Sequence, residues 1–210
     1  DVYNSVLLKD VVQRNNIRDV ELLERMILYL LDNVGHSFSA RSISNYLKQE
    51  NRKVSTETIL NYIKACCDAY LFIKLRRKDI QGKKILSANE KYYSVDHGLR
   101  ESILGTNTKN IDQVLENIVC MELLRRGYTV TIGKNGEKEI DFIASKNNDK
   151  LYIQVAYLLA GSETIEREFG IYDSIRDHYP KYVLSLDEFD MSRNGVKHLN
   201  IRDFLLSKEL

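Results

Sequence analysis

The sequence lacks several features that mark specialised classes of protein. No apolar run reaches the roughly 18–20 residues that a membrane-spanning helix needs. The opening residues, DVYNSVLLKD, lack the basic, apolar and small-residue order of a signal peptide. The cysteines Cys66, Cys67 and Cys120 have no CxxC spacing and predict no disulfide framework. These absences predict a protein outside the membrane, in the reduced setting of the cytoplasm.

An excess of charge of one sign is also missing, because 31 basic and 30 acidic residues leave a formal net charge of +1. The chain as a whole is therefore not drawn to nucleic acid, and any such binding must use a local patch. A single proline, Pro180, and the lack of a Gly/Ser-rich tract predict that any two domains are joined by a short ordered segment. With 43% hydrophobic residues, the 210-residue chain can fill one large core or two small ones.

Three helices and then a two-stranded ribbon are predicted in the first half. Apolar residues recur at helical spacing, and Ser55 or Thr56 is placed to cap the third helix. The helices are expected over 19–34, 40–50 and 56–70, and the strands over 71–78 and 85–96. This order of elements is that of a winged helix, a variant of the helix-turn-helix fold.

In a winged helix, the third helix lies on DNA and the ribbon contacts phosphates. The candidate contacts are basic residues of that helix and ribbon: Lys64, Lys74, Arg76, Arg77, Lys78, Lys83 and Lys84. The same charges also suit a solvated hairpin that discourages pairing at its edge. Winged helices also dock onto proteins, so DNA and a protein both remain open as partners.

The segment over 97–110 shows little periodicity and predicts a domain boundary. We expect a winged-helix domain over 1–100, a linker over 101–110 and a second domain over 111–210. The second domain is expected to contain a helix over 111–126, strands over 128–133, 139–146 and 150–159, a helix over 162–179, a strand over 181–189, and a short strand and helix at the end. The predicted fold class is α/β (α+β), with a mixed sheet flanked by helices.

Two acidic residues and one short segment stand out in this order: Glu116 lies on the helix, Asp141 on the middle strand, and Gln154-Val155-Ala156 on the next strand. The arrangement resembles the PD-(D/E)XK nuclease superfamily. The run LENIVCMELLRRGYTVTIGKNGEKEIDFIASKNNDKLYIQVAY also resembles the C-terminal domain of a large family of predicted prokaryotic AAA-type ATPases. The upstream segments KDVVQRNNIRDVELLERMILYLLDNVGHSFSARSISNYLK and KYYSVDHGLR are similar to the winged-helix part of that family.

The resemblance implies that an ATPase domain precedes these modules in the whole protein. This chain has no GxxxxGK[ST] phosphate-binding loop and starts at Asp1 without methionine, so we expect a fragment of a longer protein. ATP would then act only through the missing N-terminal domain, which would be a partner of this chain.

The same resemblance assigns roles to the altered motif. Glu116 and Asp141 match acidic positions, Gln154 matches the second acid, and Ala156 matches the lysine. Phosphodiester cleavage needs Mg²⁺ held by carboxylates, and Gln154 has lost one charge. Ala156 cannot donate a hydrogen bond or supply charge to the reaction. Glu139 lies two residues before Asp141 and could join Glu116, Asp141 and Gln154 as a metal ligand.

We therefore expect a degenerate nuclease site with no assigned catalytic residue. No Ser/His/Asp or Cys/His set is apparent in the sequence. The expected function is a non-catalytic C-terminal module of a AAA-type ATP-binding protein, which binds DNA, a partner protein or a second copy of itself. The alternative is a Mg²⁺-dependent DNA endonuclease with an altered PD-(D/E)XK motif.

Overall fold

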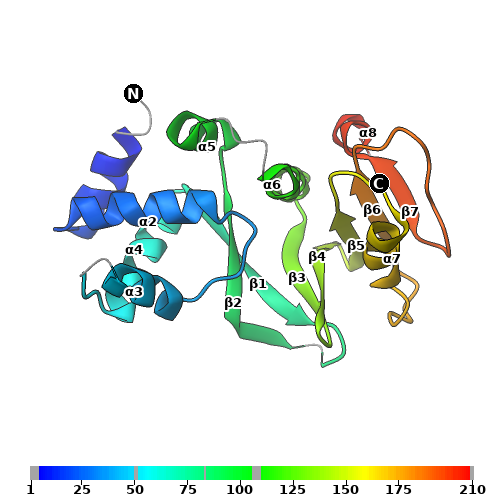
Figure 1. Cartoon of the computed structure of the whole chain (residues 1–210), viewed down its shortest axis with the longest axis horizontal. Coiled ribbons are helices and arrows are strands. Elements are labelled where there is room, and N and C mark those ends of the chain that lie inside the picture. Colours follow the sequence, from blue (N-terminus) through cyan, green and yellow to red (C-terminus); the bar gives the residue numbers. More distant parts are fainter. Residues whose placement is uncertain (1–4, 50–51, 83, 106–109, 209–210) are drawn as a thin grey trace. The chain divides into compact units, whose positions relative to one another are not determined.

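The structure is a computed structural model that describes residues 5–49, 52–82, 84–105 and 110–208 (Figure 1). The chain divides into two compact units. The first contains Asp1–Leu75 and Ala88–Thr108, and the second contains Arg76–Ser87 and Lys109–Leu210. The tip of the predicted ribbon therefore belongs to the second unit. No helix within the described ranges is long and apolar enough to cross a membrane.

The first unit is a small helical bundle with its own apolar core. Its helices are η1 (Val6–Gln13, a π-helix), α2 (Val20–Asp32), α3 (Ala40–Gln49), α4 (Thr56–Asp68) and α5 (His97–Leu104). The apolar stripe of α2 packs on Ile43, Ile59 and Ile63 of the next two helices. Ser55 caps α4, because its side chain accepts the backbone N–H of Thr58 at 3.0 Å. The three predicted helices are thus confirmed.

Helix α5 corrects the expectation of an irregular segment over 97–110. Asp96 caps this helix by accepting the N–H of Leu99. Arg100, which is only 1% exposed, donates to the carbonyl of Leu31 at 3.0 Å and forms an ion pair with Glu101. The buried face of this helix carries an arginine at a position where helical periodicity would place an apolar side chain. The apolar pattern therefore did not predict the helix.

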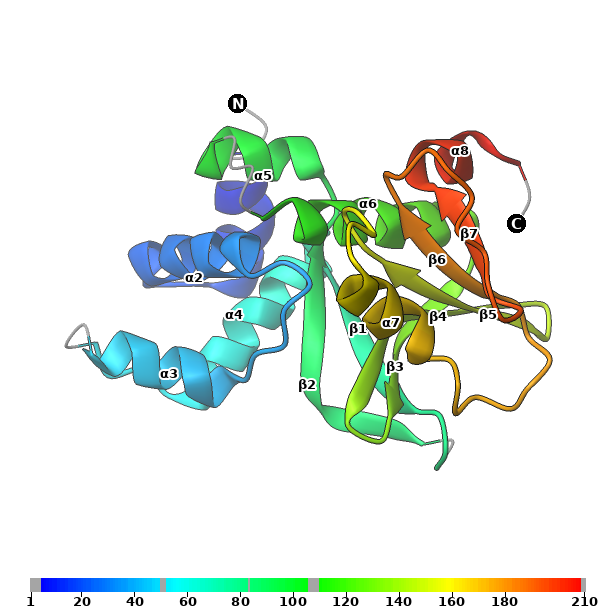
Figure 2. The same cartoon turned by 45° about the vertical axis from the view of Figure 1, so that its right-hand side comes forward.

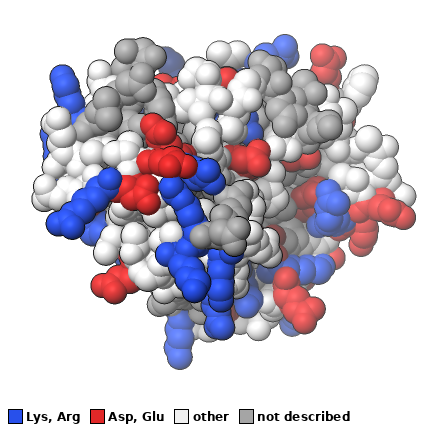
Figure 3. All heavy atoms as spheres, turned by 60° about the vertical axis from the view of Figure 1, so that its left-hand side comes forward, with Lys and Arg blue, Asp and Glu red and all other residues white. Residues whose placement is uncertain are grey.

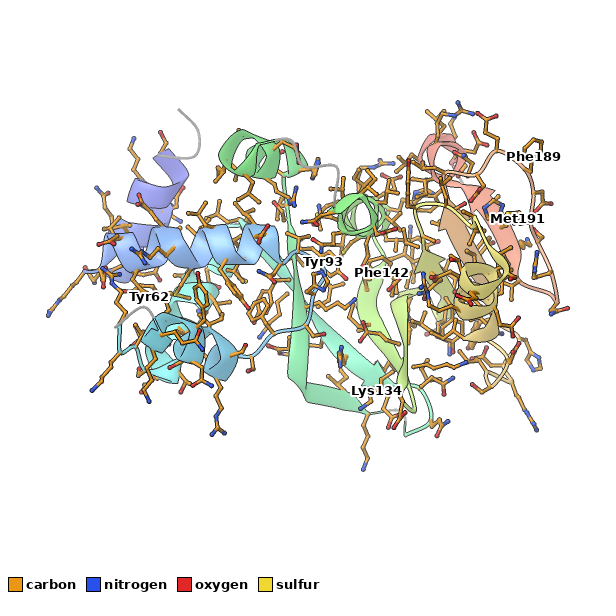
Figure 4. All side chains as sticks on the ribbon, viewed as in Figure 1. Tyr62, Tyr93, Lys134, Phe142, Phe189 and Met191 are labelled. Carbon is orange, nitrogen blue, oxygen red and sulfur yellow. The ribbon has the colours of Figure 1, made fainter. Side chains whose placement is uncertain are left out.

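Strands β1 (Phe72–Asp79) and β2 (Ile85–Ser94) form the predicted hairpin. Its base lies in the first unit, where the Tyr92 ring stacks on Phe38 with centroids 4.9 Å apart. The next residue, Tyr93, is labelled in Figure 4, and its side chain is fully buried. At the tip, β1 runs parallel to β3, with Arg77 opposite Ile132. The hairpin is therefore built into both units.

The described part of the second unit contains the rest of the sheet and three helices. Its elements are α6 (Ile111–Arg125), β3 (Thr129–Asn135), β4 (Lys138–Lys146), β5 (Asp149–Val155), α7 (Ser162–Gly170), β6 (Lys181–Ser185), β7 (Lys197–Asn200) and α8 (Ile201–Leu206). The strand order is β2-β1-β3-β4-β5-β6-β7, with β3–β4 and β4–β5 antiparallel and the pairs β1–β3, β5–β6 and β6–β7 parallel. A mixed sheet flanked by helices confirms the predicted α/β fold class.

The helices of the second unit cover both faces of its strands. Figure 2 shows α7 in front of the strands and α6 behind them. Phe169 of α7 joins a buried cluster with Ile140 and Ile143 of β4 and Tyr152 of β5. Helix α6 contacts β3, β4 and β5, and it also contacts α8. The middle strands are therefore buried on both faces.

Two predicted elements are shorter than expected. The helix predicted over 162–179 ends at Gly170, because the chain then turns with Tyr172 and Ile175 donating to carbonyls three residues back. The Tyr172 side chain also donates to the carbonyl of Tyr182 at 2.8 Å, which ties this turn to β6. The strand predicted over 181–189 ends at Ser185, whose hydroxyl accepts the N–H of Asp187. Both elements therefore end before their apolar patterns do.

Candidate functional site

Asp141 and Gln154 lie side by side where β4 and β5 separate. The last paired residues of these strands are Phe142 and Ile153. Beyond them, the Gln154 side-chain oxygen accepts the N–H of Asp141 at 3.2 Å. In return, Oδ2 of Asp141 accepts the N–H of Val155 at 2.9 Å. The two side chains thus take the place of the backbone hydrogen bonds that the separating strands no longer make.

A bulge in β4 accompanies this separation. Between Thr131 and Gly133 of β3, the partner on β4 moves from Ile143 to Ile140, so β4 contains one extra residue next to Asp141. A bulge bends its strand and leaves a residue out of the ladder. Phe142, labelled in Figure 4, lies in this part of β4. The bulge therefore positions Asp141 to reach the backbone of β5.

Aspartates also satisfy the backbone beyond β5, which corrects the strand predicted over 150–159. That strand ends at Val155. The N–H groups of Val155, Tyr157 and Leu159 donate to Asp141, Asp112 and Asp187, with N···O distances of 2.9, 2.9 and 2.8 Å. These alternate N–H groups would otherwise lack the partner strand that a ladder provides. The carboxylates let an apolar segment continue without a neighbouring strand on that side.

Ala156 occupies an apolar environment. It is 5% exposed and belongs to the buried cluster of Tyr152, Leu159 and Phe169. Its backbone N–H donates to the carbonyl of Leu184. A lysine ammonium at this position would have to leave the apolar cluster or lose its hydration, which is costly. The position that the resemblance equates with the motif lysine therefore serves the core.

Glu139 and Glu116 are the remaining metal candidates. Glu139 forms an ion pair with Arg77 of β1, with side-chain exposures of 28% and 14%. Glu116 lies half-buried on α6. Within the described ranges, no three acidic, histidine or cysteine side chains are placed to share a metal ion. Of the predicted metal ligands Glu116, Glu139, Asp141 and Gln154, the structure places Asp141 beside Gln154. Glu139 instead pairs with Arg77.

The basic candidates for nucleic-acid binding divide into two groups. Lys64 is paired with Asp68, Lys74 with Glu90 at 3.3 Å, and Arg77 with Glu139. Arg76, Lys78 and Lys84 form no ion pair with the described residues, whereas Lys83 lies outside the described residues. Figure 3 shows both signs of charge on the face it draws. The cations without an acidic partner come from the tip of the hairpin.

Ser185, Asp187 and His198 form a cluster that the sequence did not reveal. The Ser185 hydroxyl donates to Asp187 at 2.7 Å and lies 2.8 Å from Nε2 of His198. Because that hydroxyl proton is used, Nε2 donates and Nδ1 accepts the N–H of Met191 at 3.3 Å. The orientation is the reverse of a nucleophilic Ser/His pair, and Ser185 has no exposed surface. The cluster anchors the loop that carries Phe189 and Met191 in Figure 4.

Sequence reasoning also missed a polar cluster around Lys150. Its ammonium donates to the Tyr152 hydroxyl at 2.6 Å and to Asp177 at 2.9 Å. Tyr152 in turn donates to Asp177 at 2.6 Å. Burial opposes ionisation of Asp177, but the hydrogen bonds from Tyr152 and Lys150 outweigh it and hold the pKa of Asp177 below its usual range. The sequence signal for this cluster was a lysine two residues before a tyrosine, because that spacing places both side chains on one face of the strand.

These observations define a mixed α/β protein with a helical first unit, in which Asp141 and Gln154 are engaged in structural contacts. Residues 1–110 match the family described as Domain of unknown function (DUF8612), and the chain belongs to that family. An uncharacterized protein of Haemophilus influenzae is 38% identical over 206 residues, covering 98% of this chain and 51% of that protein. Uncharacterized protein MJ1544 of Methanocaldococcus jannaschii is 32% identical over 179 residues, covering 83% of this chain and 39% of that protein.

The chain thus spans 51% and 39% of the lengths of these two relatives. No solved structure is significantly similar to it.

Proposed function

We propose that this chain is a non-catalytic, DNA-binding module of a larger ATP-binding protein, and that its nuclease-like site now stabilises the fold. The observation that carries the proposal is the reciprocal pair of hydrogen bonds between Asp141 and Gln154 and the backbone of the opposite strand. A metal ion would compete with the Val155 N–H for Oδ2 of Asp141. The buried Ala156 methyl supplies no cation to the reacting phosphate.

The ATP-binding partner is inferred from the resemblance to AAA-type ATPases. The Haemophilus relative, of which this chain covers 51%, is long enough to hold a further domain of similar size. Such a domain would supply the phosphate-binding loop that this sequence lacks.

DNA is the favoured partner because Arg76, Lys78 and Lys84 lie on one hairpin and form no ion pair with the described residues. Their charges are available to phosphates, unlike those of Lys64, Lys74 and Arg77. Release of the counterions held by the phosphates favours binding, and the binding affinity falls steeply as the salt concentration rises. A local patch of this kind is the form of attraction that a chain of net charge +1 can have.

A cleavage assay tests the non-catalytic part of the proposal. Linear, circular and single-stranded DNA are incubated with the purified chain and Mg²⁺ or Mn²⁺, using the Asp141→Asn variant and the exposed Asp173→Asn variant as its control. We expect no cleavage above background from any of the three proteins. Cleavage by the unaltered chain and by Asp173→Asn, but not by Asp141→Asn, would establish the alternative, a metal-dependent endonuclease.

Duplex binding, followed by fluorescence anisotropy across a salt series, tests the DNA part. The Arg76→Ala/Lys78→Ala/Lys84→Ala variant should bind more weakly, with a salt slope reduced by about 0.9 for each phosphate contact removed. The matched control removes the exposed cations Arg14, Lys197 and Arg202 and should leave affinity unchanged. Equal loss in both variants, or no binding at low salt, would remove DNA and leave protein docking as the function.

A further inference from the structure

A cavity of about 530 Å³ lies in the second unit, and its lining includes neither Asp141 nor Gln154. It is lined from β1 by Lys78, from β4 by Ile143, from β5 by Lys150 and Tyr152, and from the segment after α7 by Arg176 and Tyr179. Its volume lies within the range of about 300–1,000 Å³ that is usual for small-ligand sites. All of these residues belong to one compact unit.

Positive charge exceeds negative charge in this cavity. Among the described residues, its cations are Lys78, Lys150 and Arg176, and its one acidic lining residue is Asp177. Asp177 is already bound by Lys150 at 2.9 Å and by Lys181 at 3.3 Å. Lys78 and Arg176 line the cavity and form no ion pair with the described residues. An anion would be attracted there.

The cationic side of the cavity is held in place before any ligand arrives. Lys150 is fixed by Tyr152 and Asp177, and its ammonium lies 4.3 Å from the centroid of the Tyr179 ring and 4.6 Å from that of Tyr152. The low pKa of Asp177 keeps this acid ionised and the lysine anchored. Such preorganisation reduces the ordering cost of binding.

The rest of the lining suits a flat, partly apolar group with polar edges. Ile143 and Ile175 provide an apolar floor. Gln81 donates to Asn135 at 3.1 Å, and Asn135 donates to Ser174 at 2.6 Å, forming a chain of amides and a hydroxyl along one wall. Tyr179 is 39% exposed, which leaves ring surface for stacking.

We propose that this cavity binds a nucleoside phosphate, with the phosphate on Lys78 and Arg176 and the base between Tyr179 and the isoleucine floor. The site goes beyond the proposed duplex contacts of the hairpin, with which it shares only Lys78. The nucleotide is either free or part of a single strand. Two adjoining hollows share Lys150 and Tyr179 and are also lined by Lys146, which gives a strand room to continue.

Isothermal titration calorimetry at low ionic strength tests the proposal with three probes. These are adenosine 5′-monophosphate, inorganic phosphate and a 5′-phosphorylated single strand of six nucleotides. We expect the mononucleotide or the strand to bind, and Arg176→Ala to weaken that binding about tenfold. The exposed Arg202→Ala variant should bind as the unaltered chain does. Binding of the mononucleotide assigns a free ligand, and binding of the strand alone assigns a nucleic-acid end.

A second variant separates a nucleotide site from a simple anion site. Tyr179→Ala should weaken nucleotide binding several-fold and leave any phosphate binding unchanged, because only the base uses the ring. The proposal is overturned by the absence of binding for every probe, by equal losses in Arg176→Ala and Arg202→Ala, or by inorganic phosphate binding as tightly as the nucleotide. Duplex binding by the hairpin is measured separately, so failure of one proposal leaves the other standing.

Discussion

At the scale of single residues, buried polar side chains form hydrogen bonds that stabilise the fold. Asp141 is 9% exposed and Ser185 fully buried, and both are engaged by neighbouring backbone or side-chain groups. A buried polar group without a partner costs free energy, so each side chain is committed to a contact. Residue types that suggest catalysis in the sequence serve here to end strands and anchor loops.

The imidazole of His198 provides a pH-dependent prediction. Burial lowers its pKa below 6.5, although Asp187 and Asp190 act in the opposite direction. Because the unfolded chain then binds the proton more readily, stability is present above pH 6.5 and is lost as pH falls toward the folded pKa. The free energy of unfolding, measured in urea, should decrease between pH 7.5 and 5.5. Protonation would also oblige Nδ1 to give up the Met191 N–H.

The control for this prediction is His198→Gln, which removes the titrating group. Its stability should vary less over the same pH range than that of the unaltered chain. A pH dependence that is identical in both proteins would exclude His198 as its source.

At the scale of elements, arginine side chains secure the ends of helices. Glu122 near the end of α6 accepts hydrogen bonds from Arg125 and Arg126, which lower its pKa against the effect of burial. Arg126 also donates to the carbonyls of Phe204 and Ser207, and its guanidinium lies 4.6 Å from the centroid of the Phe204 ring. These contacts satisfy carbonyls at the end of α8, which has no further helical turn to do so.

Arg126→Met should therefore lower the free energy of unfolding by about 2 kcal/mol, since it removes charge-assisted hydrogen bonds at a buried site. The neighbouring Arg125 binds the same carboxylate but is 70% exposed. Arg125→Met should cost less than about 1 kcal/mol, as is usual for exposed pairs. Chemical denaturation of both variants measures the difference. Equal losses would contradict the role assigned to the carbonyls of α8.

The elements themselves were largely predictable, whereas their ends were less so. Periodicity located α2, α4 and α6 because each has a broad apolar stripe. The early end of β5 could not be predicted, since an apolar run continues past Val155 while its N–H groups turn to Asp112 and Asp187. Helix α5 was missed because Arg100 occupies its buried face.

At the scale of the whole molecule, one hairpin contributes to two units. The base of β1 and β2 belongs to the first unit, while Arg76–Ser87 belongs to the second. Lys74 accordingly pairs with Glu90 of the first unit and Arg77 with Glu139 of the second. Residues of one strand thus stabilise different cores.

This division predicts separate effects of neighbouring substitutions. Arg77→Met should speed backbone hydrogen exchange in β3 and β4, with a loss of about 1 kcal/mol for a partly buried ion pair, and leave α2 and α4 unchanged. Lys74→Met, the control on the same strand, should leave β3 and β4 unchanged. Faster exchange in α2 and α4 of the Arg77→Met protein would contradict the assignment of the hairpin tip to the second unit.

Local patterns in the sequence were enough to predict most of the helices and strands and the α/β class. These follow from local periodicity and from residue types at known spacing. The contacts of Asp141 and Gln154 with the backbone of the opposite strand became apparent from the three-dimensional structure alone. It alone brought Lys78, Lys150 and Arg176 around one cavity. The reason is that hydrogen-bond partners and cavity walls come from residues distant in the chain, whose meeting no local pattern records.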